Sequence, residues 1–208
     1  MRKTITGVGI AVAATGLLLS GCSNSEQPST MDRSTSTGAT QPASHNQADT
    51  AFAQQMVPHH QQAVEMAKLA ASRGSSAKVK DLAARIQNAQ DPEIQQLTGW
   101  LAQWGATSTA PSTGMDHGST TTSMPGMDNG SMPGMMSDDE MRQLEQASGA
   151  GFDRMFLEMM TTHHQGAIEM ARTEVADGAN PDAKALAQRI IDAQQTEITE
   201  MRGMLTSL

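Results

Sequence analysis

The sequence has 208 residues, of which 22 are acidic, 14 are basic and only five are aromatic, and its formal net charge is −8. Proteins that bind nucleic acid need a basic surface for phosphate and often use aromatic rings to stack on bases, so this composition argues against a nucleic-acid partner. The single cysteine excludes an internal disulfide and a thiolate metal cluster, so any soft-metal site must use Met and His side chains.

The N-terminal segment has the pattern of a bacterial lipoprotein signal. Arg2 and Lys3 precede an apolar run over 5–19, which is too short for a transmembrane helix, and Leu-Ser-Gly then leads into Cys22. We therefore expect residues 1–21 to be a signal peptide and Cys22 to be lipidated, so that the chain is exported and anchored to the cell envelope through lipid alone. The alternative is a plain secretory signal followed by an incidental cysteine.

The next segment, 22–48, consists mainly of Ser, Thr, Gln, Asn and Pro. Such a composition buries too little apolar surface to fold, so it predicts a disordered tether.

The rest of the chain contains an internal duplication. Shifting the sequence by 104 residues aligns 49–101 with 153–205 without a gap, and 22 of the 53 aligned positions are identical. Such a repeat predicts two copies of one structural unit, a first unit over 49–104 and a second that ends the chain.

Each copy is typical of a helical hairpin. The first arm of copy one is expected over about 49–72 and the second over about 77–104, and the second arm of copy two over about 181–205. Gly74 and Gly178 occupy equivalent positions where a helix would end. Two hairpins predict an all-α fold, a four-helix bundle over 49–208. Pro92 lies inside a second arm, where a kink or local break is expected.

A Met-rich segment separates the copies. Residues 105–137 are rich in Gly, Ser, Thr and Pro, which predicts a flexible linker. Ser137 and the three acids after it then predict the start of a short extra helix, ended by Gly149 and Gly151. The second unit, 138–208, thus comprises a short helix and a hairpin.

Two His and two Met residues lie on one face of each first arm. At about 100° per residue, Met56, His59 and Met66 fall together on a helical wheel and His60 lies beside them. Neutral imidazole and thioether are both good donors to a soft or borderline metal. A single copy would be better explained by core packing and hydrogen bonding, but repetition on matching faces favours metal ligands. The candidates are His59, His60, His163, His164, Met56, Met66, Met160 and Met170.

Asp49 and its equivalent Asp153 stand one heptad before the first Met of each motif. An N-cap is the first interpretation of Asp49. A metal ligand, or a hydrogen-bond partner for an imidazole N–H, are the alternatives.

The linker supplies a second group of candidate ligands. Methionines in a segment unsuited to folding cannot be explained as core packing, and clustered thioethers suit Cu(I) or Ag(I). The alternative is a low-complexity spacer. The candidates are Met115, His117, Met124, Met127, Met132, Met135 and Met136.

Two repeated motifs resemble a known family. Phe-x-x-x-Met-x-x-His-His-x-x-Ala-[Val/Ile]-x-Met-Ala occurs at 52–67 and 156–171, and Ala-Gln-x-x-Glu-Ile occurs at 89–94 and 193–198. With these motifs the chain resembles the domain of unknown function 305 family. The resemblance implies a ferritin-like four-helix bundle in an exported protein, with some members binding copper and contributing to copper tolerance. It also implies that the His and Met residues of the two first arms contact the metal.

These observations predict an extracytoplasmic copper-binding lipoprotein that sequesters or transfers Cu(I), with Cu(II) or Ag(I) as other candidate ions and a copper-handling protein as a candidate partner. A di-iron site is disfavoured because no Glu-x-x-His pair is present. Two rival functions stay open: a metal-dependent oxidase of Cu(I) or a small substrate, and a metal-free interaction module of the envelope.

Overall fold

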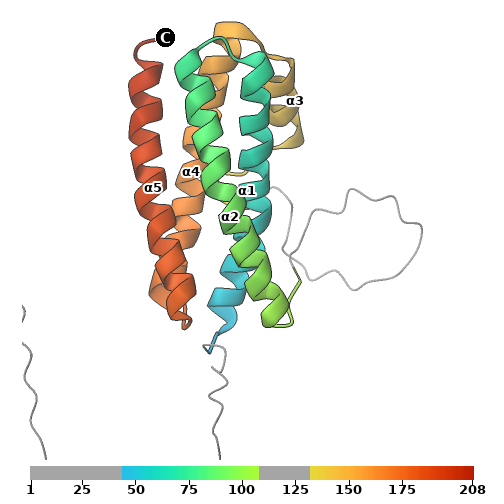
Figure 1. Ribbon diagram of the computed structural model, residues 1–208, viewed down its shortest axis with the longest axis vertical. Helices are drawn as coiled ribbons and strands as arrows, with labels where there is room; N and C mark the ends of the chain where they lie inside the picture. Colours follow the sequence, from blue (N-terminus) through green and yellow to red (C-terminus); the bar gives the residue numbers. More distant parts are fainter. Residues whose placement is uncertain (1–43, 108–131) are drawn as a thin grey trace, which may run out of the picture. The chain divides into compact units, whose positions relative to one another are not determined.

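The computed structural model describes residues 44–107 and 132–208, and within these ranges every regular element is a helix (Figure 1). The predicted signal peptide, Cys22 and most of the predicted tether lie outside the described residues. The helices are α1 (Gln47–Arg73), α2 (Ala77–Gln103), α3 (Asp138–Gln146), α4 (Gly149–Asp177) and α5 (Pro181–Leu205). The predicted all-α bundle is confirmed. None of these helices is long and apolar enough to span a membrane.

The two hairpins meet mainly through their first arms, α1 and α4. These helices are antiparallel: the Asn46 amide at the start of α1 donates to the Asp177 carbonyl at the end of α4, at 2.8 Å. At the other end of the bundle Gly74 and Gly149 form an isolated backbone bridge. The short helix α3 packs against both α1 and α4. The middles of α1 and α4 therefore face each other inside the bundle.

Each second arm begins at a cap provided by the opposite hairpin. The Asp49 carboxylate accepts the backbone N–H groups of Ala179 and Asn180, and the Asp153 carboxylate accepts those of Ser75 and Ser76, at 2.8–3.2 Å. Positions 75 and 76 are equivalent to 179 and 180 in the repeat, so the two hairpins cap one another reciprocally. This exchange ties the hairpins together at both ends of the bundle.

The N-cap of α1 is Asn46 rather than Asp49. The Asn46 side chain accepts the N–H groups of Ala48 and Asp49, and the Asp49 side chain accepts the Asn46 N–H, which together form a capping box. Asp49 thus serves the start of two helices, its own and α5.

The predicted helix ends at Gly74 and Gly178 are confirmed, but neither glycine adopts a left-handed conformation. A Cβ atom at Gly74 would lie 2.9 Å from both Asp153 Oδ1 and the Ala70 carbonyl, and one at Gly178 would overlap the Glu174 side chain. Glycine is therefore needed at these C-caps for close approach.

One expectation about a helix end is wrong. Gly149 and Gly151 do not end α3, which stops at Gln146 where Ala147 turns extended; they belong to the first turn of α4 instead. The helix α2 runs unbroken through Pro92, so the local break is not observed.

Candidate metal centre

The four candidate histidines form one buried layer in the middle of α1 and α4. His59, His60, His163 and His164 each have 0% exposure, and we refer to them as the imidazole layer. The Met side chains of the same motifs are buried as well. Met56, Met66 and Met160 are fully buried and Met170 is 7% exposed. Glu65 and Glu169, in the same two helices, are exposed.

His59 and His163 lie against each other where α1 crosses α4. Their ring centroids are 3.8 Å apart and the ring planes are tilted by 41°. Because these residues occupy equivalent positions in the repeat, the approximate twofold axis of the bundle passes between them. Two imidazoles from different hairpins are thus brought into direct contact.

The outer two imidazoles are each held by a glutamate from the second arm of the same hairpin. His60 Nε2 lies 2.8 Å from Glu93 Oε2, and His164 Nε2 lies 2.6 Å from Glu197 Oε2. A carboxylate can only accept, so Nε2 carries the proton. In the neutral ring the Nδ1 lone pair is then bare, and Nδ1 has no partner among the described residues in either histidine.

Glu93 and Glu197 were not predicted to belong to the site. Their signal was present in the repeated Ala-Gln-x-x-Glu-Ile motif, but that motif had no assigned role. The same motif contributes Gln90 and Gln194, which are 3% and 4% exposed. Within the described residues both amide atoms of Gln90 and the Gln194 oxygen have no partner, so the polar layer extends onto α2 and α5.

The inner two imidazoles are not equivalent. His59 Nε2 lies 3.1 Å from the Pro133 carbonyl, which must accept, so Nδ1 of His59 is again the bare nitrogen. Neither ring nitrogen of His163 makes a hydrogen bond of normal geometry in the described structure, although the His59 backbone lies close enough to oppose the lowering of its pKa. Burial lowers the pKa of His59 to about 3 and that of His163 well below its usual value, with neighbouring imidazoles adding to the shift. Both rings are therefore neutral at physiological pH.

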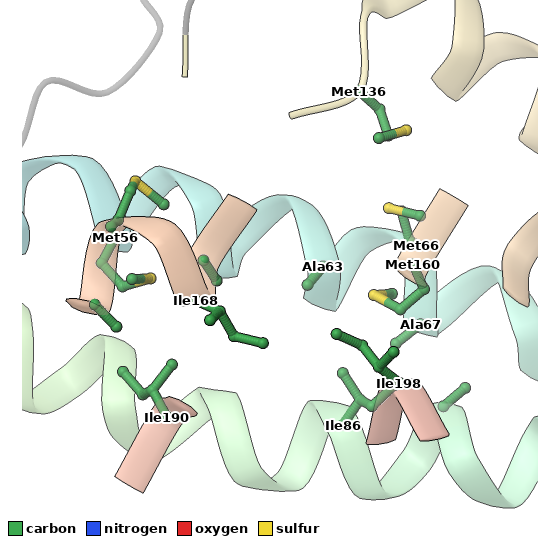
Figure 2. Packing of buried hydrophobic residues seen from close by; sticks show 14 of the residues in the cluster. Met56, Ala63, Met66, Ala67, Ile86, Met136, Met160, Ile168, Ile190 and Ile198 are labelled. Atoms are coloured by element: carbon green, nitrogen blue, oxygen red, sulfur yellow. The ribbon is translucent and has the colours of Figure 1, made fainter. Parts of the chain in front are cut away.

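The donors suit a soft ion of low coordination number. In residues 44–107 and 132–208, no three His, Cys, Asp or Glu side chains are grouped so that they could hold a metal ion. The described residues thus contain no ready-made zinc-like cage of nitrogen and oxygen ligands. They instead bury imidazole and thioether side chains in the same helical core, and thioether selects Cu(I) over harder ions. Figure 2 shows Met66, Met160 and Met136 together on one side of Ala63 and Met56 on the other.

The remaining predicted ligands are the two aspartates and the linker residues. Asp49 and Asp153 are ten residues before the first His of each motif, about 15 Å along the helix, and their oxygens accept backbone N–H groups. Of the linker candidates, Met132 and Met135 are half-buried and Met136 is 8% exposed against the bundle. The others lie outside the described residues: Met115, His117, Met124 and Met127.

The chain is similar to proteins of known structure. The sequence profile of the domain of unknown function DUF305 matches residues 49–205. A DUF305 protein from Streptomyces coelicolor, described as a candidate secreted protein, is 32% identical, with a TM-score of 0.66 over 77% of this chain and 93% of its own. A DUF305 fragment from Deinococcus radiodurans is 30% identical, with a TM-score of 0.66 over 81% and 100% of the two chains.

A third similar structure is that of CopM in its Cu(I)-bound form. It is 29% identical, with a TM-score of 0.60, and the match covers 76% of this chain and 96% of CopM. CopM has also been crystallised with Cu(II) and with Ag. No curated protein matches the chain in sequence.

Proposed function

This chain belongs to the DUF305 family, and we propose that it is an extracytoplasmic copper-binding protein that takes up Cu(I) in the imidazole layer between α1 and α4. It holds the ion or passes it to another copper-handling protein, and no catalytic turnover is involved. Acylation of Cys22 attaches it to the envelope through lipid.

The observation that carries this proposal is the set of bare nitrogens inside the bundle. Nδ1 of His59, His60 and His164 and both ring nitrogens of His163 are buried without a partner in the described structure. Leaving a polar group buried and unpaired costs about 1–3 kcal/mol. An ordinary core rarely contains several such groups in one layer, whereas ligation by a metal ion satisfies the lone pairs that bind it.

The identity of the ion is supported by the thioethers and by the relatives. Met56, Met66, Met160 and Met170 are buried in the same core as the imidazoles, and a thioether is a soft ligand that favours Cu(I). The similar structure CopM is known with Cu(I), Cu(II) and Ag bound. An export route is supported by the sequence of residues 1–22 and by the relative described as a candidate secreted protein.

The proposal is tested by native mass spectrometry of the mature chain loaded with Cu(I) in competition with a chromophoric Cu(I) chelator. We expect the wild-type chain to retain copper and the double variant His59→Ala/His163→Ala to lose at least one ion. His45→Ala is the matched control, because His45 is exposed and its ring stacks on Trp104 at 4.7 Å, away from the layer.

An unchanged metal-free mass for the wild-type chain would remove the copper proposal and leave the metal-free interaction module. Oxygen uptake during Cu(I) loading that is absent in the double variant would indicate an oxidase rather than a protein that stores or transfers copper.

A further inference from the structure

The end of the predicted linker does not leave the bundle but lies across it. Residues 132–136, here called the strap, pack over α1 and α4 with Met136 buried. Met135 N–H donates to the Met132 carbonyl at 3.2 Å, and Gly134 has φ +77°. The turn comprises residues 132–135, with proline second and glycine third, and its hydrogen bond joins the first and fourth residues. This is the pattern of a type II β-turn. The strap is therefore a defined structure presented to the helices.

The helices are shaped to receive this turn. The Gln62 side-chain amide donates to the Met136 carbonyl and accepts the Met136 N–H, both at 2.8 Å. Gly166 occupies the equivalent position in the other repeat, and a Cβ atom there would overlap the Pro133 carbonyl. At this position of the repeat, α1 carries an amide that binds the strap and α4 carries a glycine that leaves room for it.

One atom of the strap contacts the imidazole layer. The Pro133 carbonyl accepts from His59 Nε2, in the way that Glu93 and Glu197 accept from His60 and His164. Hydrogen bonds to the far nitrogen of a metal-binding imidazole fix its tautomer and orientation. With the strap docked, three of the four rings present Nδ1 as the bare nitrogen.

We propose that the strap is a positioning element for the metal site, in which the Pro133 carbonyl holds His59 in the tautomer that leaves Nδ1 free to bind the ion. This inference rests on the proposed function. It assigns roles to Pro133, Gln62 and Gly166, and it makes the two repeats unequal, because His163 alone lacks such a partner in the described structure.

The test is Gly166→Ala, which blocks Pro133 while increasing helix propensity. Gly151→Ala in the same helix is the matched control, since a Cβ atom there meets nothing within 4 Å. In long-range ¹H–¹⁵N spectra of the metal-free chain, we expect the hydrogen-bonded Nε2–H signature of His59 in the wild type and in Gly151→Ala, and its loss in Gly166→Ala. Cu(I) affinity in chelator competition should fall about 10- to 100-fold in Gly166→Ala only.

The outcomes separate the two proposals. If Gly166→Ala binds Cu(I) as tightly as the wild type, or only takes it up faster, the strap is a cover and the positioning role is overturned while copper binding stands. A wild-type chain that binds no Cu(I) overturns both, whatever the imidazole spectra show. Gln62→Ala removes the side chain that binds Met136 without adding volume, and it should also lose the His59 signature and the Cu(I) affinity. If Gln62→Ala keeps both, the proposal is contradicted.

Discussion

The two hairpins α1–α2 and α4–α5 agree at the positions that build the buried polar layer and differ at positions around it. They share the His-His pair, the glutamate that holds the second His, and the aspartate that caps the opposite hairpin. They differ at Gln62 against Gly166, Ala70 against Glu174, and Pro92 against Thr196. The shared residues make a symmetric site, and the differing residues make its two halves unequal.

The largest effect should come from removing one of the reciprocal caps. Asp153→Ala leaves two backbone donors and the Ser75 hydroxyl without their acceptor, so we expect the free energy of unfolding to fall by about 3 kcal/mol. Asp49→Ala should cost less, because the Glu174 carboxyl lies beside Gly178 and can ionise to accept from the same turn. Urea denaturation followed by circular dichroism measures both, and equal losses would contradict the asymmetry.

A smaller effect of opposite sign is expected at Pro92. In α5 the equivalent Thr196 is exposed and its hydroxyl donates to the Asp192 carbonyl at 3.0 Å. Pro92 is also exposed and lacks the N–H that would close this turn of α2. Pro92→Thr should therefore stabilise the chain by about 2 kcal/mol, measured as a rise in the urea midpoint. An unchanged midpoint would mean that packing already compensates for the proline.

Replacing the inner histidines one at a time separates the contributions of the two hairpins. His163→Leu removes a buried ring with two unpartnered nitrogens, so the metal-free chain should become more stable by about 1 kcal/mol. His59→Leu also removes the donor to Pro133 and should gain less. Unfolding midpoints in the presence of a copper chelator test this difference. Equal gains would show that the hydrogen bond from His59 to the strap contributes nothing to stability.

The helices could be predicted from the sequence because their signals are local and repeated. The second arm of copy two was predicted at 181–205, as observed, since Pro181 and the repeat marked its start. The contacts that position the imidazoles could not be predicted in this way. Pro133 meets His59 from 74 residues away, and Glu93 meets His60 from 33 residues away. Periodicity indicates which face of a helix is buried, but not which residue of another element faces it.

Which of the predicted ligands bind the metal stays a prediction, because this too depends on contacts between different elements. The wheel gathers the His and Met residues of one arm, and the structure shows that both arms contribute to one core. Asp49 and Asp153 illustrate the difficulty: an acid near a helix start suggests a cap of its own helix, yet each carboxylate accepts backbone N–H groups at the start of a helix of the other hairpin. Such an exchange depends on how the two copies pack, which no pattern within one copy encodes.

The smallest effect is expected from Glu174, which replaces the alanine of copy one at one end of the bundle. Its side chain is 1% exposed, and burial, with the nearby Asp49 carboxylate, raises its pKa to about 8 despite nearby Lys184. Burial alone would raise the pKa of Asp49 too, but the backbone donors of Asn46, Asn180 and Ala179 outweigh it and lower that pKa. Asp49 is thus the ionised partner and Glu174 the protonated one.

Because the pKa of Glu174 is higher in the folded chain than its ordinary value of 4.5, protonated Glu174 stabilises the fold. That contribution is complete below about pH 4.5, declines as the pH rises, and is lost above about pH 8. The buried His59, with its pKa lowered from 6.5 to about 3, has the opposite dependence, since its contribution is complete above pH 6.5 and is lost toward pH 3. Glu174→Gln removes only the first dependence, so its urea midpoint should fall less than that of the wild type between pH 5 and 8. Glu169→Gln, at an exposed position of the same helix, is the control, and parallel pH profiles for all three chains would show that Glu174 is already ionised at neutral pH.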